Sequence, residues 1–340
     1  MAIFIYKKPY SIIMAIKLDL KDRKILYQLD INARQPNSEI AKKVGLSKQV
    51  VGFRITRLVE QKVLLKFYAV TDISRLGLSI HKNFVRLQNL DSEKETEFVN
   101  YLKNHPNVVW VVSCDGKFDL AFAIWSKNME HLDATLKEID KSFGEYISER
   151  QIAPIIRGEY FIRDYILEKQ KTPMQRKSFF AAVGEQLKID LNDWKILFEL
   201  GKDARATSVS IAASVGLSPD AVGDRIRKME KSGLIRHYNI VPNESVFLYL
   251  HYKVLVGLRN MSAEKEQALI QHCSSNPNIV YVVKTLGPWE FEMDIEVESA
   301  QKFRDIMMDL KTKFKEIIQD YSALNIYQLH KYNFCPSVQK

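Results

Sequence analysis

Between residues 17 and 66, apolar side chains recur at helical spacing in three short runs, separated by residues that begin or end helices. Asp19 and Ser47 are expected to cap the first and third helices, because their side-chain oxygens can accept the free N–H groups of a first turn. Gly45 is expected to end the second helix in the left-handed conformation. The expected buried stripes are Ile25, Leu26 and Leu29, then Ile40, Ala41 and Val44, then Val50, Val51, Ile55 and Leu58.

After Leu65 the pattern changes to strands alternating with helices. The sequence predicts strands at 83–88, 108–114, 119–125 and 147–157, and helices at 92–104 and 129–143. This βαββαβ order indicates a ferredoxin-like layer in which two helices cover one face of an antiparallel sheet. The strand at 108–114 is apolar on both faces, so a second sheet of the same kind is expected to cover the other face. The fold class is therefore α+β.

The sequence contains an internal repeat: two copies of one unit, offset by 171 residues. Residues 17–66 and 188–237 share 20 identities in 50 positions, and Val44-Gly45-Leu46-Ser47 returns as Val215-Gly216-Leu217-Ser218. A repeat of this length indicates duplicated domains and not a solenoid, whose periods are 20 to 50 residues. The expected divisions are helical domains at 17–70 and 188–241, βαββαβ domains at 71–167 and 242–338, and a linker at 168–187.

The helical domains have the spacing of a helix-turn-helix. Ala41, Gly45 and Val51 supply a small residue for a tight helix crossing, a turn glycine and an apolar contact from the third helix. Ala212, Gly216 and Val222 repeat this spacing in the second copy. A helical hairpin that binds no nucleic acid is the alternative interpretation.

In a helix-turn-helix, the N-terminal half of the last helix contacts base edges in the major groove. Gly52 and Gly223 are explained by close approach to a partner backbone or by packing on a neighbouring helix. Arg54 and Arg225 lie beside the buried stripe, which favours a structural ion pair or a phosphate contact over base reading. The candidate DNA-binding residues are Ser47, Lys48, Gln49, Gly52, Phe53, Arg54, Thr56, Arg57, Ser218, Arg225, Arg227 and Lys228.

We call the two helix-turn-helix units the first reader (residues 17–66) and the second reader (residues 188–237). The two readers differ in charge. Residues 17–66 hold 12 basic and 5 acidic residues, whereas residues 188–237 hold 9 and 7. Asp220 and Asp224 occupy the second groove face where the first has Gln49 and Phe53, and carboxylates are repelled by phosphates. The second reader is therefore expected to bind DNA more weakly, to bind a different DNA sequence, or to have a mainly structural role.

Composition narrows the class of protein. The 340 residues are 46% hydrophobic, which is typical of an ordered chain. The formal net charge of +9 fits an anionic partner such as double-stranded DNA, and a lysine-rich proteome is the alternative explanation. No apolar run is long enough to span a membrane. The three cysteines lack disulfide-framework or zinc spacing, which indicates a reducing cytoplasm. Residues 1–14 are interpreted as an N-terminal extension or as the result of a wrongly assigned translation start. No catalytic or metal-binding constellation is apparent.

The helical motif, including Asn32-Ala33-Arg34, resembles the leucine-responsive/asparagine-type (Lrp/AsnC) transcription regulators, and the resemblance covers nearly all of both halves. It implies winged helix-turn-helix domains joined by a strand to effector (RAM) domains that pair through their sheets, within one chain or in a homo-oligomer. It also implies amino-acid effectors, with the family's glycine–x–aromatic–acid turn at 116–119 and 287–290. Lys62 departs from the family glycine that Gly233 matches, and Pro288 and Glu290 depart within the second turn.

The two turns have open interpretations. Asp115-Gly116 between apolar runs is a hairpin signal that explains the glycine alone. A ligand-binding turn would use carboxylates and exposed amides to hold the effector, an amino acid or a related small molecule; no cofactor is expected. The effector-binding candidates are Asp115, Gly116, Phe118, Asp119, Gly287, Trp289 and Glu290. The rival functions are a siroheme-type tetrapyrrole decarboxylase on the same architecture and an assembly scaffold that does not bind DNA.

Overall fold

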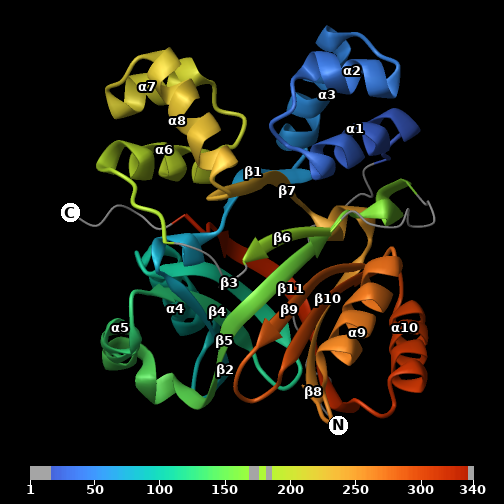
Figure 1. The fold of residues 1–340 in the computed structure, drawn as a ribbon. Helices are drawn as coiled ribbons and strands as arrows, with labels where there is room; N and C mark the ends of the chain where they lie inside the picture. The colour runs from blue at the N-terminus through green and yellow to red at the C-terminus, as the bar shows by residue number, and fades with distance from the viewer. Residues whose placement is uncertain (1–16, 168–175, 181–185, 336–340) are drawn as a thin grey trace.

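The computed structural model describes residues 17–167, 176–180 and 186–335. Two helical units lie side by side above a barrel of strands, and further helices cover the outside of that barrel (Figure 1). Within the described ranges no helix is both long and apolar enough to cross a membrane. The proposed extension at residues 1–14 and most of the linker at 168–187 lie outside the described residues.

Each helical unit consists of three helices with the predicted caps. The first contains α1 (Leu20–Ile31), α2 (Asn37–Val44) and α3 (Lys48–Glu60), and the second contains α6 (Leu191–Lys202), α7 (Ser208–Val215) and α8 (Pro219–Lys231). Asp19 forms a capping box with Asp22, and Ser47 accepts the Val50 N–H. Gly45 ends α2 with φ of 67°, in the left-handed region as predicted.

One residue of the predicted stripes is on the wrong side. Val51, Ile55 and Leu58 are buried, but Val50 is 40% exposed, so its predicted place in the core is wrong. Val50 and Val51 are successive residues of α3 and so lie about 100° apart around the helix axis; Val51 faces the core and Val50 faces solvent. Position 50 therefore belongs to the outer face of the reader.

The two βαββαβ domains have the predicted order of elements. The first contains β2 (Ser79–Leu87), α4 (Ser92–Asn104), β3 (Val108–Asp115), β4 (Leu120–Ser126), α5 (Met129–Phe143) and β5 (Ile147–Phe161). The second contains β8 (Leu250–Leu258), α9 (Ala263–Ser275), β9 (Ile279–Thr285), β10 (Phe291–Val297), α10 (Ala300–Lys313) and β11 (Ile318–Tyr332). β2 begins four residues before the predicted strand, and β5 ends four residues after it.

The two four-stranded sheets join at both edges and form a closed ring of eight strands. The hydrogen-bonded order is β2-β4-β3-β11-β8-β10-β9-β5, and β5 also pairs with β2. β5 and β11 are each 15 residues long, so the first half of each pairs within its own copy and the second half pairs with the other copy. Pairing of the two halves within one chain is thus built into the fold, and closure leaves neither sheet with a free edge at these positions.

Two further strands connect the barrel to the helical units. β1 (Leu64–Thr71) follows the first unit and pairs antiparallel with β7 (Ile235–Pro242), which follows the second. We call this pair the ribbon. A short strand in the connection between the copies, β6 (Arg176–Phe180), pairs with β5. Short 3-10 helices occur at Ile73–Leu76, Gly144–Tyr146, Asp164–Leu167 and Glu244–Phe247.

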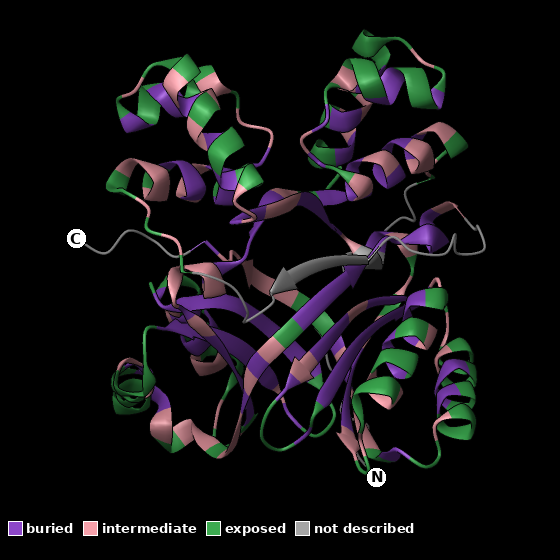
Figure 2. Ribbon diagram, viewed as in Figure 1, coloured by how far each residue is buried: buried purple, intermediate pink, exposed green. Residues whose placement is uncertain are grey.

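The apolar core is divided into layers. One cluster lies inside the barrel and contains Phe84, Trp110 and Val112. Two others lie between the barrel and its outer helices, one in each copy. A fourth fills both helical units and extends between them. The barrel strands are mostly buried on both faces, whereas the outer faces of the helices are exposed (Figure 2). This burial confirms the prediction that a second sheet covers the inner face of β3.

Candidate DNA-binding surface and effector turns

The outer face of α3 presents a solvent-facing surface that carries several polar side chains. Lys48, Gln49 and Thr56 are exposed, as is the Phe53 ring, which is 69% exposed. Ser47 is exposed as well, but its hydroxyl accepts the Val50 N–H at 3.2 Å and so is used as the helix cap. Ser218 caps α8 in the same way, through the Ala221 N–H. These exposed side chains are free to meet base edges or phosphates.

Gly52 lies where α3 passes the beginning of α2. A Cβ atom at this position would lie 3.2 Å from Asn37 Nδ2, closer than ordinary van der Waals contact. Its counterpart Gly223 has looser surroundings, with Arg227 Nη1 3.4 Å from the same hypothetical atom. Packing on the neighbouring helix therefore accounts for Gly52, and a close approach to DNA is not needed to explain it.

Arg54 and Arg57 are held by carboxylates of α1. Arg54 Nη1 lies 2.7 Å from Asp19 Oδ2 and 2.8 Å from Asp22 Oδ1, and Arg57 Nη2 lies 2.6 Å from the same Asp22 oxygen. Asp22 is buried, so its charge is compensated by these two arginines. The ion pair expected for Arg54 is confirmed, and the capping box of α1 also fixes the rotation of α3.

The second reader repeats only part of this arrangement. Arg225 Nη1 lies 2.7 Å from both Asp190 and Asp193. Hydrogen bonds from the Asp193 N–H and from Arg225 lower the pKa of the Asp190 carboxyl. Arg227 pairs with Asp224 on the surface, and Lys228 is exposed without a carboxylate partner among the described residues. The positive charge on the exposed face of α8 is therefore partly neutralised by Asp224.

Three of the five charges by which the readers differ lie at the end of α2 and the beginning of α3. Lys42, Lys43 and Lys48 are all exposed in the first reader. The residues at the corresponding positions of the second reader, 171 further on, are Ala213, Ser214 and Pro219. α2 and α7 lie at the end of the molecule farthest from the barrel (Figure 1). The first reader thus has three exposed ammonium groups that the second lacks.

The readers are joined by two equivalent arginines, each of which donates hydrogen bonds to backbone carbonyls of the other reader. Arg34 Nη1 donates to the carbonyls of Ala204 and Ala206, at 2.5 and 2.8 Å. Arg205 Nη1 donates to the carbonyls of Ala33 and Gln35, at 2.6 and 3.2 Å. We call these residues the arginine clamp. Arg34 stands in the family motif, but nothing in the sequence showed that its partner would be the other copy.

The predicted effector turns carry their aromatic residues into the barrel. Phe118 and Trp289 are buried, and both contact Phe84, with ring centroids 5.8 and 4.9 Å away. Asp119 accepts the Leu87 N–H at 2.7 Å, and Glu290 accepts the Leu258 N–H at 2.7 Å. Each carboxylate thus accepts a hydrogen bond from the end of a neighbouring strand in its own copy. Glu290 therefore has the same structural role as Asp119.

The turn glycines lie against the opposite copy. A Cβ atom on Gly116, whose φ is 133°, would lie 2.9 Å from the Ala323 carbonyl oxygen of β11. A Cβ atom on Gly287, with φ of 121°, would lie 3.0 Å from the Ile152 oxygen of β5. Asp115 is exposed at the end of β3. Backbone conformation and close packing across the joint between copies therefore explain both glycines.

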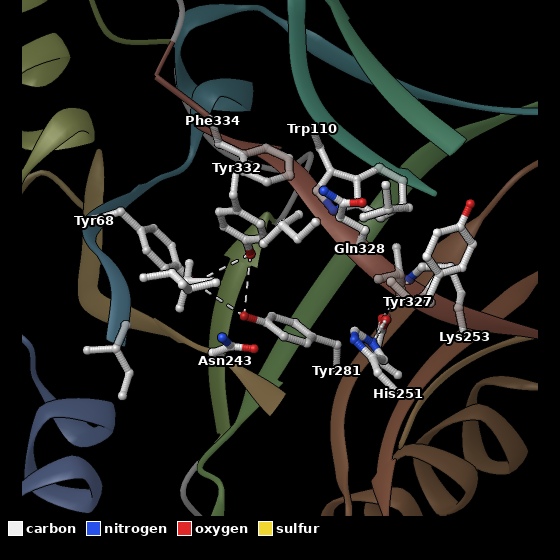
Figure 3. Close-up of a pocket in the computed structure, with 18 of the residues that line it drawn as sticks. Tyr68, Trp110, Asn243, His251, Lys253, Tyr281, Tyr327, Gln328, Tyr332 and Phe334 are labelled. Atoms are coloured by element: carbon white, nitrogen blue, oxygen red, sulfur yellow. Dashed lines mark hydrogen bonds and ion pairs between the residues drawn. The ribbon is translucent and has the colours of Figure 1, made fainter. Parts of the chain in front are cut away.

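Sequence reasoning missed a set of charged residues inside the barrel. Glu292, Asp294 and Glu296 alternate along β10, where β4 of the first copy has Ala121, Ala123 and Trp125. All three acids are buried and meet buried cations. Acids at alternate positions of an otherwise apolar strand were the available signal. Asp294 and the cations that these acids meet line a cavity of about 290 Å³ between the ribbon and the barrel (Figure 3).

The fold and the exposed reading helices define a two-reader helix-turn-helix protein on a shared barrel. Residues 18–59 match the AsnC-type helix-turn-helix domain, and residues 189–236 match the winged helix-turn-helix DNA-binding model. The chain is 30% identical over 145 residues to the leucine-responsive regulatory protein of Rhizobium meliloti, covering 42% of this chain and 93% of that one. It is 33% identical over 120 residues to the HTH-type transcriptional regulator FL11 of Pyrococcus horikoshii, covering 35% and 78%.

The chain belongs to the Lrp/AsnC family of transcription regulators, as the helical motif and its repetition predicted. A solved structure of the siroheme decarboxylase NirDL covers 94% of both chains with a TM-score of 0.61 and 11% identity. That likeness extends over both copies and concerns the fold alone.

Proposed function

We propose that this protein is a sequence-specific transcription regulator in which the first reader supplies most of the affinity for double-stranded DNA. The observation that carries the proposal is the set of exposed lysines on α2 and α3, Lys42, Lys43 and Lys48, which the second reader replaces with uncharged residues. In a helix-turn-helix the first helix of the motif crosses the DNA backbone and the second enters the groove. Ammonium groups at this corner are suited to phosphates.

The exchange of these three residues between the copies tests the proposal. Genome-wide binding profiling would supply the operator, and fluorescence anisotropy at several salt concentrations would then give the affinity. Replacing Lys42, Lys43 and Lys48 with Ala, Ser and Pro is expected to flatten the slope of log K against log salt by up to about 2.7, since each phosphate contact contributes about 0.9.

The reciprocal substitutions, made in the second reader, test whether the same lysines increase its affinity for DNA. Introducing lysine at Ala213, Ser214 and Pro219 is expected to strengthen binding and steepen the salt slope. The control is Lys137→Ala on the outer helix α5, which should leave both quantities unchanged. Equal losses from damage to either reader, or no effect of the three lysines, would contradict the asymmetry.

For the turns, we propose a structural role for Asp119 and Glu290 over amino-acid binding. Both carboxylates already accept a backbone N–H, and an amino acid held by Asp119 would compete with the Leu87 N–H. Asp119→Ala is expected to lower the melting temperature without any ligand. A melting-temperature increase with one of the twenty amino acids that Asp119→Ala abolishes would restore the ligand-binding interpretation.

A tetrapyrrole decarboxylase is a second candidate, because the likeness to NirDL covers both copies. The cavity disfavours it. An engineered cavity of about 150 Å³ accommodates one benzene molecule, so 290 Å³ corresponds to about two six-membered rings and not to a macrocycle of four rings. Incubation with an iron tetrapyrrole followed by gel filtration tests it: a stoichiometric Soret band in the protein peak would favour the enzyme.

A further inference from the structure

The cavity between the ribbon and the barrel is separate from both turns and from the reading helices. Its roof includes Tyr68 of β1 and Ile240 of β7, and its floor comes from barrel strands of both copies. Leu65 and Tyr327, which line it, are 47% and 45% exposed, so the cavity communicates with solvent. Its volume of about 290 Å³ is at the lower end of the range for small-molecule sites.

Aromatic groups form much of the wall. Trp110 lies on one side, and Tyr68, Tyr281 and Tyr332 lie together on another, with their hydroxyls 3.2 to 3.4 Å apart (Figure 3). The three phenols come from β1, β9 and β11, so the ribbon strand of the first copy and two barrel strands of the second contribute to one hydroxyl cluster. Flat apolar walls with a few convergent polar groups are typical of sites for ring-bearing ligands.

The charged groups of the wall are mostly cationic. Lys82, Lys253 and Arg163 line the cavity, and the only carboxylate among its lining residues is Asp294. Lys82 and Lys253 are equivalent positions of the two copies, and their ammonium groups lie 5.8 and 5.4 Å from the centre of the Trp110 ring. Glu292 and Glu296 pair with Lys82 and Arg163 but do not line the cavity.

Lys82 differs from the other two cations in its hydrogen bonds. Arg163 is fully engaged by Asp30 and Glu296, and Lys253 donates to both oxygens of Asp294. Among the described residues, the Lys82 ammonium donates a single hydrogen bond, to Glu292, although an ammonium has three donors. Burial lowers the pKa of Lys82, so an added anion would favour its charged form.

We propose that this cavity binds a small aromatic carboxylate of about two fused rings, with the rings against Trp110 and the tyrosines and the carboxylate on Lys82. Volume sets the size of the ligand, the aromatic wall sets its shape, and the unsatisfied donors of a buried ammonium set its charge. The roof of the cavity belongs to the ribbon, whose two strands follow the two readers. A bound ligand would therefore affect the relative position of the readers. That consequence rests on the proposed DNA-binding function, whereas ligand binding itself does not.

The test uses the full chain without DNA and three probes of one shape. Isothermal titration calorimetry is run with 2-naphthoate, neutral 2-naphthylmethanol and cationic 2-naphthylmethylamine. We expect saturable one-to-one binding of 2-naphthoate, at least about tenfold tighter than of the neutral probe, as a hydrogen bond to a charged group implies. Absence of saturable 2-naphthoate binding at millimolar concentration, or equal affinity for all three probes, would overturn the proposal.

Two variants locate the site. Lys82→Met combined with Glu292→Gln removes the buried pair together, which avoids an uncompensated charge, and should erase the preference for 2-naphthoate over the neutral probe. Val112→Phe fills the cavity and should abolish binding of both. Lys117→Met on the first turn is the matched surface control and should change nothing. Binding that survives Val112→Phe would place the ligand elsewhere, and displacement of 2-naphthoate by an iron tetrapyrrole would reassign the ligand class.

Discussion

The arginine clamp is expected to determine how firmly the two readers are held together. Arg34→Met removes hydrogen bonds to the carbonyls of Ala204 and Ala206 and leaves the reciprocal bonds of Arg205 in place. A hydrogen bond to a charged group contributes about 1.5 to 3 kcal/mol. Ala206 is half-buried, so water can replace the bond to its carbonyl, whereas Ala204 is buried; the joint should therefore lose about 2 kcal/mol.

This loss can be converted into a rate of amide exchange. The Ala33 N–H donates to the Tyr238 carbonyl at 3.1 Å, and the Ala204 N–H donates to the Phe67 carbonyl at 3.1 Å. These two bonds attach each reader to the ribbon strand of the other copy. Because about 1.4 kcal/mol is a factor of ten, a loss of about 2 kcal/mol should speed exchange at both amides about thirtyfold through local opening.

Hydrogen–deuterium exchange with mass spectrometry measures this directly. Arg34→Lys keeps the charge but not the planar fork, so it should resemble Arg34→Met more than the unmodified protein. The double variant with Arg205→Met should lose less than the sum of the single losses, because both arginines hold the same joint. Peptides from the barrel strand β3 are the internal control. Unchanged exchange at Ala33 and Ala204, or equal acceleration in β3, would refute the reasoning.

Three further outcomes are expected. Lys62 has φ of 55° where Gly233 has 72°, so Lys62→Gly should raise the free energy of unfolding and Gly233→Lys should lower it, each by about 1 kcal/mol in urea titrations. Arg163→Met breaks the bridge between α1 and β10 and should cost about 3 to 5 kcal/mol, with exchange in α1 rising first. Burial lowers the pKa of His330 to about 4 from 6.5, so the unfolded chain takes up the proton first as pH falls. Stability should therefore decline between pH 6.5 and 4, and less steeply in His330→Asn; a slope identical in that variant would assign the effect to other groups.

The sequence by itself determined the local elements and the repetition. Caps at Asp19 and Ser47 and the left-handed glycine at Gly45 follow from interactions within a few residues, so spacing sufficed to place them. The alternation in each second half was enough to predict the βαββαβ order, and the doubly apolar β3 showed that its inner face needed a cover. The locations of the ligand candidates followed from the same local patterns, but their roles did not.

Only the tertiary structure decided what depends on partners about 170 residues away. Val50 is exposed because α3 is oriented with Val51, Ile55 and Leu58 toward the core. Phe118 and Trp289 are core residues because the turns of both copies meet inside one barrel. Arg34 donates to carbonyls of the other copy, and the cations around the cavity come from β2, from β8 and from the segment just after β5. Periodicity records which side of an element is apolar, whereas barrel closure and the pairing of buried charges arise from contacts between distant segments, which no local pattern encodes.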